Sequence, residues 1–374
     1  MHNLDQNSSI LYVSYPLQSV SEDSAGGAEQ VLWTLEREAA RNGYRTTVAA
    51  CGGSHVAGEL LDTGAAVEAV DVFETREAEH SARVLQRCKE RRFSLIHDHS
   101  GHFFRYAAEI DTPMLVTLHL PRSFYPADTF NNLAPNVYFN GVSERQLDAF
   151  RDLPRMLPPV RNGIALDLFR PGSLPRRHLL WLGRICPEKA PHIALDVAAR
   201  MDIPLVLAGQ VYPFSYHQQY FRREIRPRLA KNPISCFIDT PSLDEKLRVL
   251  QRARALLITS EAAETSSLVA LEAMACGTPV IAYGNGALPE IIRNGETGFV
   301  VHTVREMCNA IDAVDEIRSE ACRKYVEQNC SAEKMASEYF ERYREVLTRA
   351  STSAQSAAKK DVPGSSVLCD GTEQ

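Results

Sequence analysis

The chain has 374 residues, enough for two domains with proper hydrophobic cores. Its composition is that of an ordinary globular protein, and a formal net charge of −6 at pH 7 gives no general reason to expect binding to nucleic acid. The nine cysteines are never spaced as Cys-x-x-Cys, which predicts reduced thiols, a cytoplasmic location and no metal cluster. No signal peptide or membrane span is expected from the pattern of apolar runs.

Strands and helices alternate through the first half of the chain. An apolar run at 10–14 predicts a strand, and Gly26-Gly27 then opens a helix with one apolar face. Further strands, before a helix from Ser143, are expected at 45–51, 66–72, 94–97, 114–119 and 136–142. This alternation is typical of an open parallel sheet covered by helices, the α/β class.

The alternation breaks between residues 162 and 175, where proline and glycine become frequent, and we place an interdomain linker there. A capping box at Ser242-Leu-Asp-Glu245 begins one of the later helices, and a long helix is expected after Ser331. The tail from 351 to 374 is rich in Ser, Ala, Lys and Gly and is predicted to be disordered. A second series of strands is predicted at 179–183, 204–208, 234–238, 255–259, 279–283 and 299–301.

Two carboxylates, Glu264 and Glu272, lie on either side of a predicted junction between a strand and a helix. Hydroxyl residues at 265–267 are expected to cap this helix, which continues to about Cys276. Unpaired N–H groups at such a helix start suit a phosphate or a sugar hydroxyl. Glu272 would lie ~12 Å further along the helix, so the two acids could contact distant parts of one extended ligand. The alternative is a pair of solvated surface acids.

Other polar groups also follow predicted strands. Arg184 and Lys189 share one loop, which suits a diphosphate, although both could be solvated surface bases. Gly26 and Gly27 would let a phosphate or a sugar approach the backbone, or would form a plain tight turn. His119 ends a strand and can donate to a sugar hydroxyl, or pack at the rim of the sheet.

Three further patterns could indicate a metal, a dinucleotide cofactor or an anionic partner, and in each case we favour a simpler interpretation. The group His97-Asp98-His99 with His102 could bind a metal, but a polar rim is the interpretation that we favour. Gly-Asn-Gly-Ala-Leu-Pro at 284–289 is an incomplete dinucleotide motif, so neither nicotinamide nor flavin is predicted. Basic residues between 222 and 231 could contact anionic lipid or an acidic acceptor, although a solvated face is favoured.

Five segments together carry a resemblance to the retaining glycosyltransferases of family 4, over roughly residues 10 to 349. The resemblance implies the GT-B fold, in which two Rossmann-like domains face each other across a cleft. Residues 1–170 would form the acceptor side, 171–330 the donor side, 331–349 a helix that crosses back, and 350–374 a disordered tail. The segments are Gly26-Gly27, Val160-Arg-Asn-Gly-Ile164, Gly183-Arg184-x4-Lys189, Glu264 to Pro279, and Gly286-Ala-Leu-Pro-Glu290 with Asn294-Gly-x-x-Gly298.

The resemblance also implies roles for individual residues. Arg184 and Lys189 would neutralise the donor diphosphate, Glu272 would accept from ribose hydroxyls, and Glu264 would contact the transferred sugar. His119 would line the reaction centre. The chain has Glu-Thr-Ser-Ser where Glu-Pro-Phe-Gly is common, which changes how closely the backbone can approach the ligand. The remaining donor contacts would come from Gly26, Gly27 and the amides near Ser266, Ser267, Leu268 and Val269.

The expected activity is transfer of a sugar, with retention, from a nucleotide sugar to a hydroxyl group. UDP is the donor nucleotide that the family suggests. A saccharide, a lipid-linked sugar and a small molecule all stay open as acceptors. We expect no cofactor, no divalent metal and no nucleic acid, in a cytoplasmic enzyme of glycan biosynthesis for which contact with a membrane surface is left open. Two other classes also stay open: a GT-B nucleotide-sugar epimerase and a non-catalytic nucleotide-sugar-binding protein.

Overall fold

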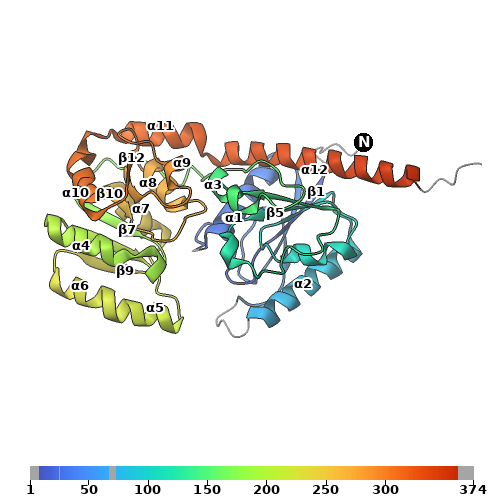
Figure 1. The fold of residues 1–374 in the computed structure, drawn as a ribbon, viewed down its shortest axis with the longest axis horizontal. Coiled ribbons are helices and arrows are strands. Elements are labelled where there is room, and N and C mark those ends of the chain that lie inside the picture. The colour runs from blue at the N-terminus through green and yellow to red at the C-terminus, as the bar shows by residue number, and fades with distance from the viewer. Residues whose placement is uncertain (1–7, 25, 67–72, 361–374) are drawn as a thin grey trace, which may run out of the picture.

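The computed structural model describes residues 8–24, 26–66 and 73–360, and shows two α/β domains joined by a linker and by a long helix (Figure 1). Each domain contains a six-stranded sheet in which all neighbouring strands are parallel. The strand orders are β3-β2-β1-β4-β5-β6 and β12-β11-β10-β7-β8-β9, which is the doubly wound arrangement in both cases. The predicted α/β class is therefore confirmed.

The strands of the first sheet lie within a few residues of their predicted positions, with one exception. The third strand was expected at 66–72, but β3 is Glu59–Asp62, and residues 67–72 lie outside the described residues. This edge strand is short and carries charged ends, so it lacks the apolar run on which the prediction depends. The other strands are β1 Ser9–Val13, β2 Arg45–Ala50, β4 Leu95–Asp98, β5 Met114–Leu118 and β6 Val137–Gly141.

The second sheet follows its predicted positions closely, and the capping box at Ser242 is present at the start of α7. Its strands are β7 His178–Leu182, β8 Leu205–Gly209, β9 Cys236–Asp239, β10 Ala253–Ile258, β11 Val280–Tyr283 and β12 Gly298–Val301. The α-helices are α1 Gly27–Arg41, α2 Phe73–Glu90, α3 Glu144–Leu147, α4 Pro191–Met201, α5 Ser215–Tyr220, α6 Arg226–Lys231, α7 Leu243–Arg252, α8 Leu268–Ala275, α9 Leu288–Ile291, α10 Val304–Ala313, α11 Ser319–Asn329 and α12 Ala332–Lys360.

Burial on both faces explains why the central strands are continuous apolar runs. All five residues of β1 are buried, because helices cover both sides of the sheet. One face packs against α1 and α12, and the other carries Phe139 of β6, which clusters with Phe103 and Phe150 from outside the sheet. The carboxyl ends of the strands therefore remain as the edge where polar loops gather.

The final helix, α12, leaves the second domain and runs along the first (Figure 1). Tyr339 and Tyr343 are fully buried there against the first sheet. The helix continues to Lys360, past the boundary at 349 that the sequence suggested, so residues 350–360 are helical and not disordered. Alanine is the strongest helix former and is frequent in this stretch, which accounts for the extension. Residues 361–374 lie outside the described residues. Among the helices that the structure describes, none is long and apolar enough to cross a membrane.

The two chain segments that cross between the domains are hydrogen-bonded to each other. The Ile164 amide donates to the Cys330 carbonyl at 3.0 Å, and the Ala332 amide donates to the Ile164 carbonyl at 2.9 Å. The two segments can approach this closely because residue 163 is a glycine. A Cβ at this position would overlap the Ser331 carbonyl oxygen. The linker and the start of α12 thus form one paired connection.

Gly163→Ala should separate this connection, since backbone has to move to admit the methyl group. We expect a loss of about 1–3 kcal/mol in stability, the usual cost of overpacking. Thermal melting followed by circular dichroism measures it. Gly27→Ala is the matched control, because a Cβ at that position meets its nearest side-chain atom at an ordinary 3.6 Å. Equal melting temperatures for the two variants would contradict this account of Gly163.

Candidate active site

Lys189 and Glu264 meet at the carboxyl ends of β7 and β10. The Lys189 Nζ atom lies 2.5 and 2.6 Å from the two carboxylate oxygens of Glu264, and only 12% of the glutamate side chain is exposed. A cation held between both oxygens of a mostly buried carboxylate is a charge-assisted contact of the stronger kind. Two residues that the sequence selected separately, for a diphosphate and for a sugar, therefore form one unit.

Backbone contacts hold both members of this pair. The Glu188 carbonyl accepts from the amides of Glu261 at 2.9 Å and Ala262 at 3.3 Å, which ties the lysine loop to the glutamate loop. The Ala287 amide donates to the Glu264 carbonyl at 2.8 Å. Gly286 adopts a φ of +64°, and a Cβ there would overlap the Glu264 backbone, so glycine is required on both grounds. The pair is consequently fixed by three loops.

Helix α8 begins beside this pair, but its hydroxyl residues act differently from the prediction. Ser267 occupies the N-cap position in an extended conformation, and its side chain makes no capping hydrogen bond. Thr265 instead donates from its hydroxyl to the His119 carbonyl at 2.8 Å, across the domain boundary. The Ser143 hydroxyl of the first domain returns a bond to the Thr265 carbonyl at 2.8 Å. Thr265, one of the predicted caps, thus fastens the domains together, and the N-cap residue Ser267 gives the first turn of α8 no side-chain cap.

Glu272 lies within α8, eight residues after Glu264, and its environment differs from that of Glu264. Its side chain is 2% exposed, and Lys246 Nζ lies 2.5 Å from its Oε1 atom. Its Oε2 atom is buried with no hydrogen-bond partner among the described residues. Lys246 also lies over the Phe169 ring at 5.3 Å, so the ion pair is shielded on one side by an aromatic face. The carboxylate is therefore held firmly by one oxygen only.

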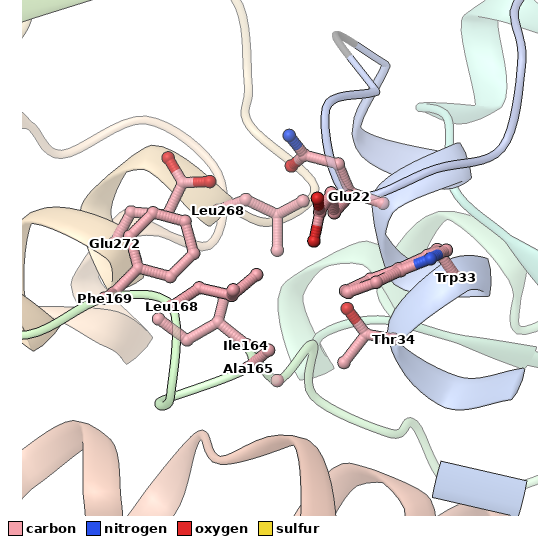
Figure 2. Close-up of a pocket in the computed structure, with 11 residues that line it drawn as sticks. Glu22, Trp33, Thr34, Ile164, Ala165, Leu168, Phe169, Leu268 and Glu272 are labelled. Atoms are coloured by element: carbon pink, nitrogen blue, oxygen red, sulfur yellow. The ribbon is translucent and has the colours of Figure 1, made fainter. Parts of the chain in front are cut away.

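A pocket between the domains includes Glu272 (Figure 2). Figure 2 shows Glu272, Leu268 and Phe169 on one side, with Trp33 and Glu22 facing them from the first domain. The linker contributes apolar side chains to its floor, and α1 contributes the opposite wall. Its complete lining is Glu22, Gln30, Trp33, Thr34, Gly163, Ile164, Ala165, Leu168, Phe169, Leu268 and Glu272.

The glycine pair at the start of α1 faces this same region. A Cβ at Gly27 would lie 3.6 Å from Leu268, so the first turn of α1 approaches the first turn of α8. At Gly26 a Cβ would overlap the Glu29 carboxylate, which folds back over the glycine. Glu29 is buried, and this burial raises its pKa to about 7. Sequence reasoning missed Glu29, because an acid in the first helical turn is normally explained by the helix dipole.

His119 is connected to α12 through two other histidines. Its Nε2 atom lies 2.9 Å from Nδ1 of His99, and His99 Nε2 lies 3.2 Å from His97 Nδ1. The Tyr343 hydroxyl of α12 lies 2.7 Å from the same His97 atom. Burial lowers the pKa of His119 to about 4 and the pKa values of His97 and His99 well below the usual range. The row therefore consists of neutral imidazoles at physiological pH.

The prediction that residues 97–99 form a polar rim is wrong, because the structure buries them almost completely. Alternation along the strand places residues 97 and 99 on one face, and this signal could have predicted the contact between their rings, whose centroids lie 4.0 Å apart. Asp98 points elsewhere and accepts from the amides of Ser100 at 2.8 Å and Phe104 at 2.9 Å. The histidines bond to one another and to Tyr343, which gives no support to a metal at this position.

Arg184 and the basic run lie at the surface of the second domain. Arg184 is exposed at the start of the lysine loop, and its guanidinium lies over the Tyr212 ring at 5.7 Å. Tyr212 in turn accepts from Gln18 of the first domain at 3.1 Å. In the basic run, Arg228 pairs with Asp196 and Glu224, while Arg222, Arg223, Arg226 and Lys231 are exposed. The structure thus brings Lys189 and Glu264 into contact, with Arg184 on the same loop and Glu272 in the adjoining pocket.

Comparison with known proteins identifies the family. The model of group 1 glycosyl transferases matches residues 172–331, and that of glycosyltransferase family 4 matches residues 25–176. The chain belongs to the family 4 glycosyltransferases. A D-inositol 3-phosphate glycosyltransferase of Mycobacterium tuberculosis is 34% identical over 173 residues, which cover 42% of this chain. The chain spans only 36% of that relative's length.

Solved structures confirm the predicted GT-B fold. The avilamycin A biosynthesis glycosyltransferase AviGT4 is 21% identical, with a TM-score of 0.70 over 91% of this chain and 98% of its own. Sucrose-phosphate synthase from Thermosynechococcus elongatus is 19% identical, with a TM-score of 0.77 over 92% and 100%. Anabaena HepE, crystallised with UDP-glucose, is 17% identical, with a TM-score of 0.71 over 91% and 99%. At these identities the likeness concerns the fold.

The raised pKa of Glu29 makes a prediction about stability and pH. The folded protein binds this proton more tightly than the unfolded chain, whose pKa is 4.5, so the contribution is complete below about pH 4.5. It is lost as the pH rises through about 7, by on the order of 3 kcal/mol. Glu29→Gln has no proton to lose, so its melting temperature relative to wild type should rise between pH 5 and pH 8.

Thermal melts across this pH interval measure the difference, with the exposed Glu74→Gln as the matched control. The control should differ from wild type by a constant amount. If Glu29→Gln also shows a constant difference, Glu29 is ionised in the folded protein and the burial argument is contradicted.

Proposed function

We propose that this protein is a retaining glycosyltransferase that moves a sugar from a UDP-sugar to an acceptor hydroxyl without a divalent metal. The observation that carries the proposal is the ion pair of Lys189 with Glu264 shortly before the start of α8, with Arg184 on the same loop as Lys189. Two cations on one loop and the positive end of a helix are suited to a diphosphate. Family membership and the UDP-glucose complex of Anabaena HepE support the choice of donor.

Diphosphate binding would use the Lys189–Glu264 pair in two ways. A phosphate oxygen would share the Lys189 ammonium, which can donate three hydrogen bonds. Glu264 keeps that ammonium in place with both oxygens, and their remaining lone pairs would accept from hydroxyl groups of the transferred sugar. Arg184 is exposed on the same loop and would supply a second cation to the diphosphate. Negative charge that develops on the leaving diphosphate would therefore meet preorganised donors.

Ribose binding would explain the unpaired oxygen of Glu272. A buried carboxylate oxygen normally accepts hydrogen bonds, and Oε2 has none from the described residues. A ribose hydroxyl in the pocket of Figure 2 would supply the missing donor. Trp33 and the apolar linker residues would shield this bond from water. Glu264 precedes α8 and Glu272 lies within it. The distance between these two acids would then suit the extended shape of a nucleotide sugar, with its sugar near Glu264 and its ribose near Glu272.

The acceptor side would be formed by the first domain around His119. Its neutral imidazole cannot attract the diphosphate as a cation, but it can exchange hydrogen bonds with a sugar hydroxyl. In the proposed step the bond between the anomeric carbon and the diphosphate oxygen breaks, and the acceptor oxygen attaches on the same face. The leaving phosphate takes the acceptor proton, so no protein nucleophile is required.

The two acids should respond differently to substitution. Glu272→Gln should weaken UDP binding by roughly 10- to 100-fold, since a hydrogen bond to a charged group contributes ~1.5–3 kcal/mol. Glu264→Gln should mainly lower turnover and leave UDP affinity nearly unchanged, because its proposed ligand is the sugar. Calorimetry with UDP and an assay of UDP release from UDP-sugars measure both effects.

Glu245→Gln is the control, since its exposed carboxylate only caps α7. If both active-site variants bind UDP and turn over like this control, Glu264 and Glu272 are ordinary structural acids. Donor consumption in the presence and absence of acceptor also separates transfer from epimerisation.

Charge neutralisation by the protein predicts independence from divalent metals. Arg184→Ala or Lys189→Ala should lower turnover by ~10²–10³, the loss that follows removal of one preorganised donor to a developing anion. EDTA should leave the wild-type rate almost unchanged. Arg305→Ala, an exposed cation on α10, is the control for net charge. Activity that EDTA abolishes and Mg²⁺ or Mn²⁺ restores would assign the neutralising role to a metal.

A further inference from the structure

A cluster of three metal-ligating side chains lies within and beside the loop that carries Arg184 and Lys189. Cys186 and Glu188 belong to this loop, and His217 belongs to α5. One ligand atom from each residue, namely a thiol sulfur, a carboxylate oxygen and an imidazole nitrogen, lies within 4.8 Å of the other two. None of these three side chains has a part in the transfer proposed above.

His217 gives an independent indication of a ligand. Its side chain is fully buried, yet neither ring nitrogen has a hydrogen-bond partner among the described residues. Rings of Phe214 and Tyr216 surround it, with centroids 5.1 and 4.2 Å from its own. Buried polar atoms almost always have partners, so an imidazole held in this way beside a thiol and a carboxylate requires an explanation.

The donor set fits zinc better than a hard cation. Zn²⁺ binds sulfur at about 2.3 Å, and nitrogen and oxygen at about 2.0–2.2 Å, in a tetrahedron. Those bond lengths need ligand atoms separated by roughly 3.3–3.7 Å, so the cluster has to contract by about 1 Å. Glu188 is exposed, and the Cys186 thiol donates weakly to the Arg184 carbonyl at 3.5 Å and is also hydrogen-bonded to the Glu188 side chain. The thiol and the carboxylate are thus already adjacent, and rotation of the exposed Glu188 side chain is the movement that would close the site around an ion.

We propose that Cys186, Glu188 and His217 bind one Zn²⁺, with a fourth position open to water. The ion would fasten α5 to the loop that carries Arg184, whose guanidinium already lies over Tyr212 just before that helix. Binding of Zn²⁺ would release the Cys186 thiol proton to solvent, and the thiolate and the carboxylate together would balance the two charges of the ion, so that the occupied site is electrically neutral. Arg184 and Lys189 keep the role of neutralising the diphosphate, and EDTA is still expected to spare turnover.

Metal binding by the full chain tests the proposal without reference to activity. The metal-stripped, reduced protein is titrated with Zn²⁺ in competition with a chromophoric chelator, and separately with Co²⁺. We expect one ion per chain and a near-ultraviolet charge-transfer band from thiolate to Co²⁺. Cys186→Ser should abolish the band, and His217→Ala should weaken Zn²⁺ binding by at least about 100-fold, since even outer-shell partners contribute 10- to 100-fold.

Matched controls are Cys236→Ser, an exposed thiol of the same domain, and Glu261→Gln, an exposed acid near the loop. Both should bind Zn²⁺ and Co²⁺ like wild type. If His217→Ala does not fold, Glu188→Gln together with the wild-type Co²⁺ spectrum decides the question. Binding of no ion by the wild type, or binding that Cys186→Ser and Glu188→Gln leave unchanged, would overturn the zinc site. A protein without transferase activity would still give the same metal titration, so failure of the two proposals can be distinguished.

Discussion

The ion pair between Lys189 and Glu264 is the interaction on which the rest of the site depends. It joins loops at the ends of β7 and β10, and the backbone of the Gly286 turn supports it from a third side. A lysine with both carboxylate oxygens within 2.6 Å is fixed in position before any ligand arrives. Such preorganisation is what stabilises a developing anion without reorganisation during the reaction. In the proposed function, this pair would determine where a diphosphate lies, and the start of α8 and the exposed Arg184 would act beside it.

The same region is also the contact between the domains. Thr265 lies directly after Glu264 and bonds to the His119 carbonyl, while Ser143 bonds to Thr265. The Glu290 carboxylate of the second domain accepts from the Arg145 amide at 2.8 Å, at the positive end of α3. Several hydrogen bonds therefore join the two domains beside the Lys189–Glu264 pair. The row of neutral histidines runs from His119 to α12, so the final helix contacts this edge of the first domain as well as the sheet.

Sequence predicted the fold, and it selected candidate site residues that the structure brings together, because both depend on local patterns. Apolar runs located the buried strands, and the motif spacing selected Lys189, Glu264 and Glu272. The pairing of Lys189 with Glu264 joins residues that are 75 positions apart, and no local pattern encodes such a contact. The capping prediction failed at Thr265, because a hydroxyl before a helix can bond across a domain boundary equally well. The buried histidines, Glu29 and the partners of Glu272 depend on tertiary packing in the same way.

A crystal structure of the complex with UDP, grown in the presence of EDTA, tests the central claim most directly. This account predicts that the diphosphate contacts Arg184, Lys189 and the first amides of α8, while a ribose hydroxyl donates to Oε2 of Glu272. Glu264 should remain against Lys189, with its free side directed toward the position of the sugar. A diphosphate bound away from Lys189, or UDP that enters the crystals only when a divalent metal bridges it to the protein, would contradict the account.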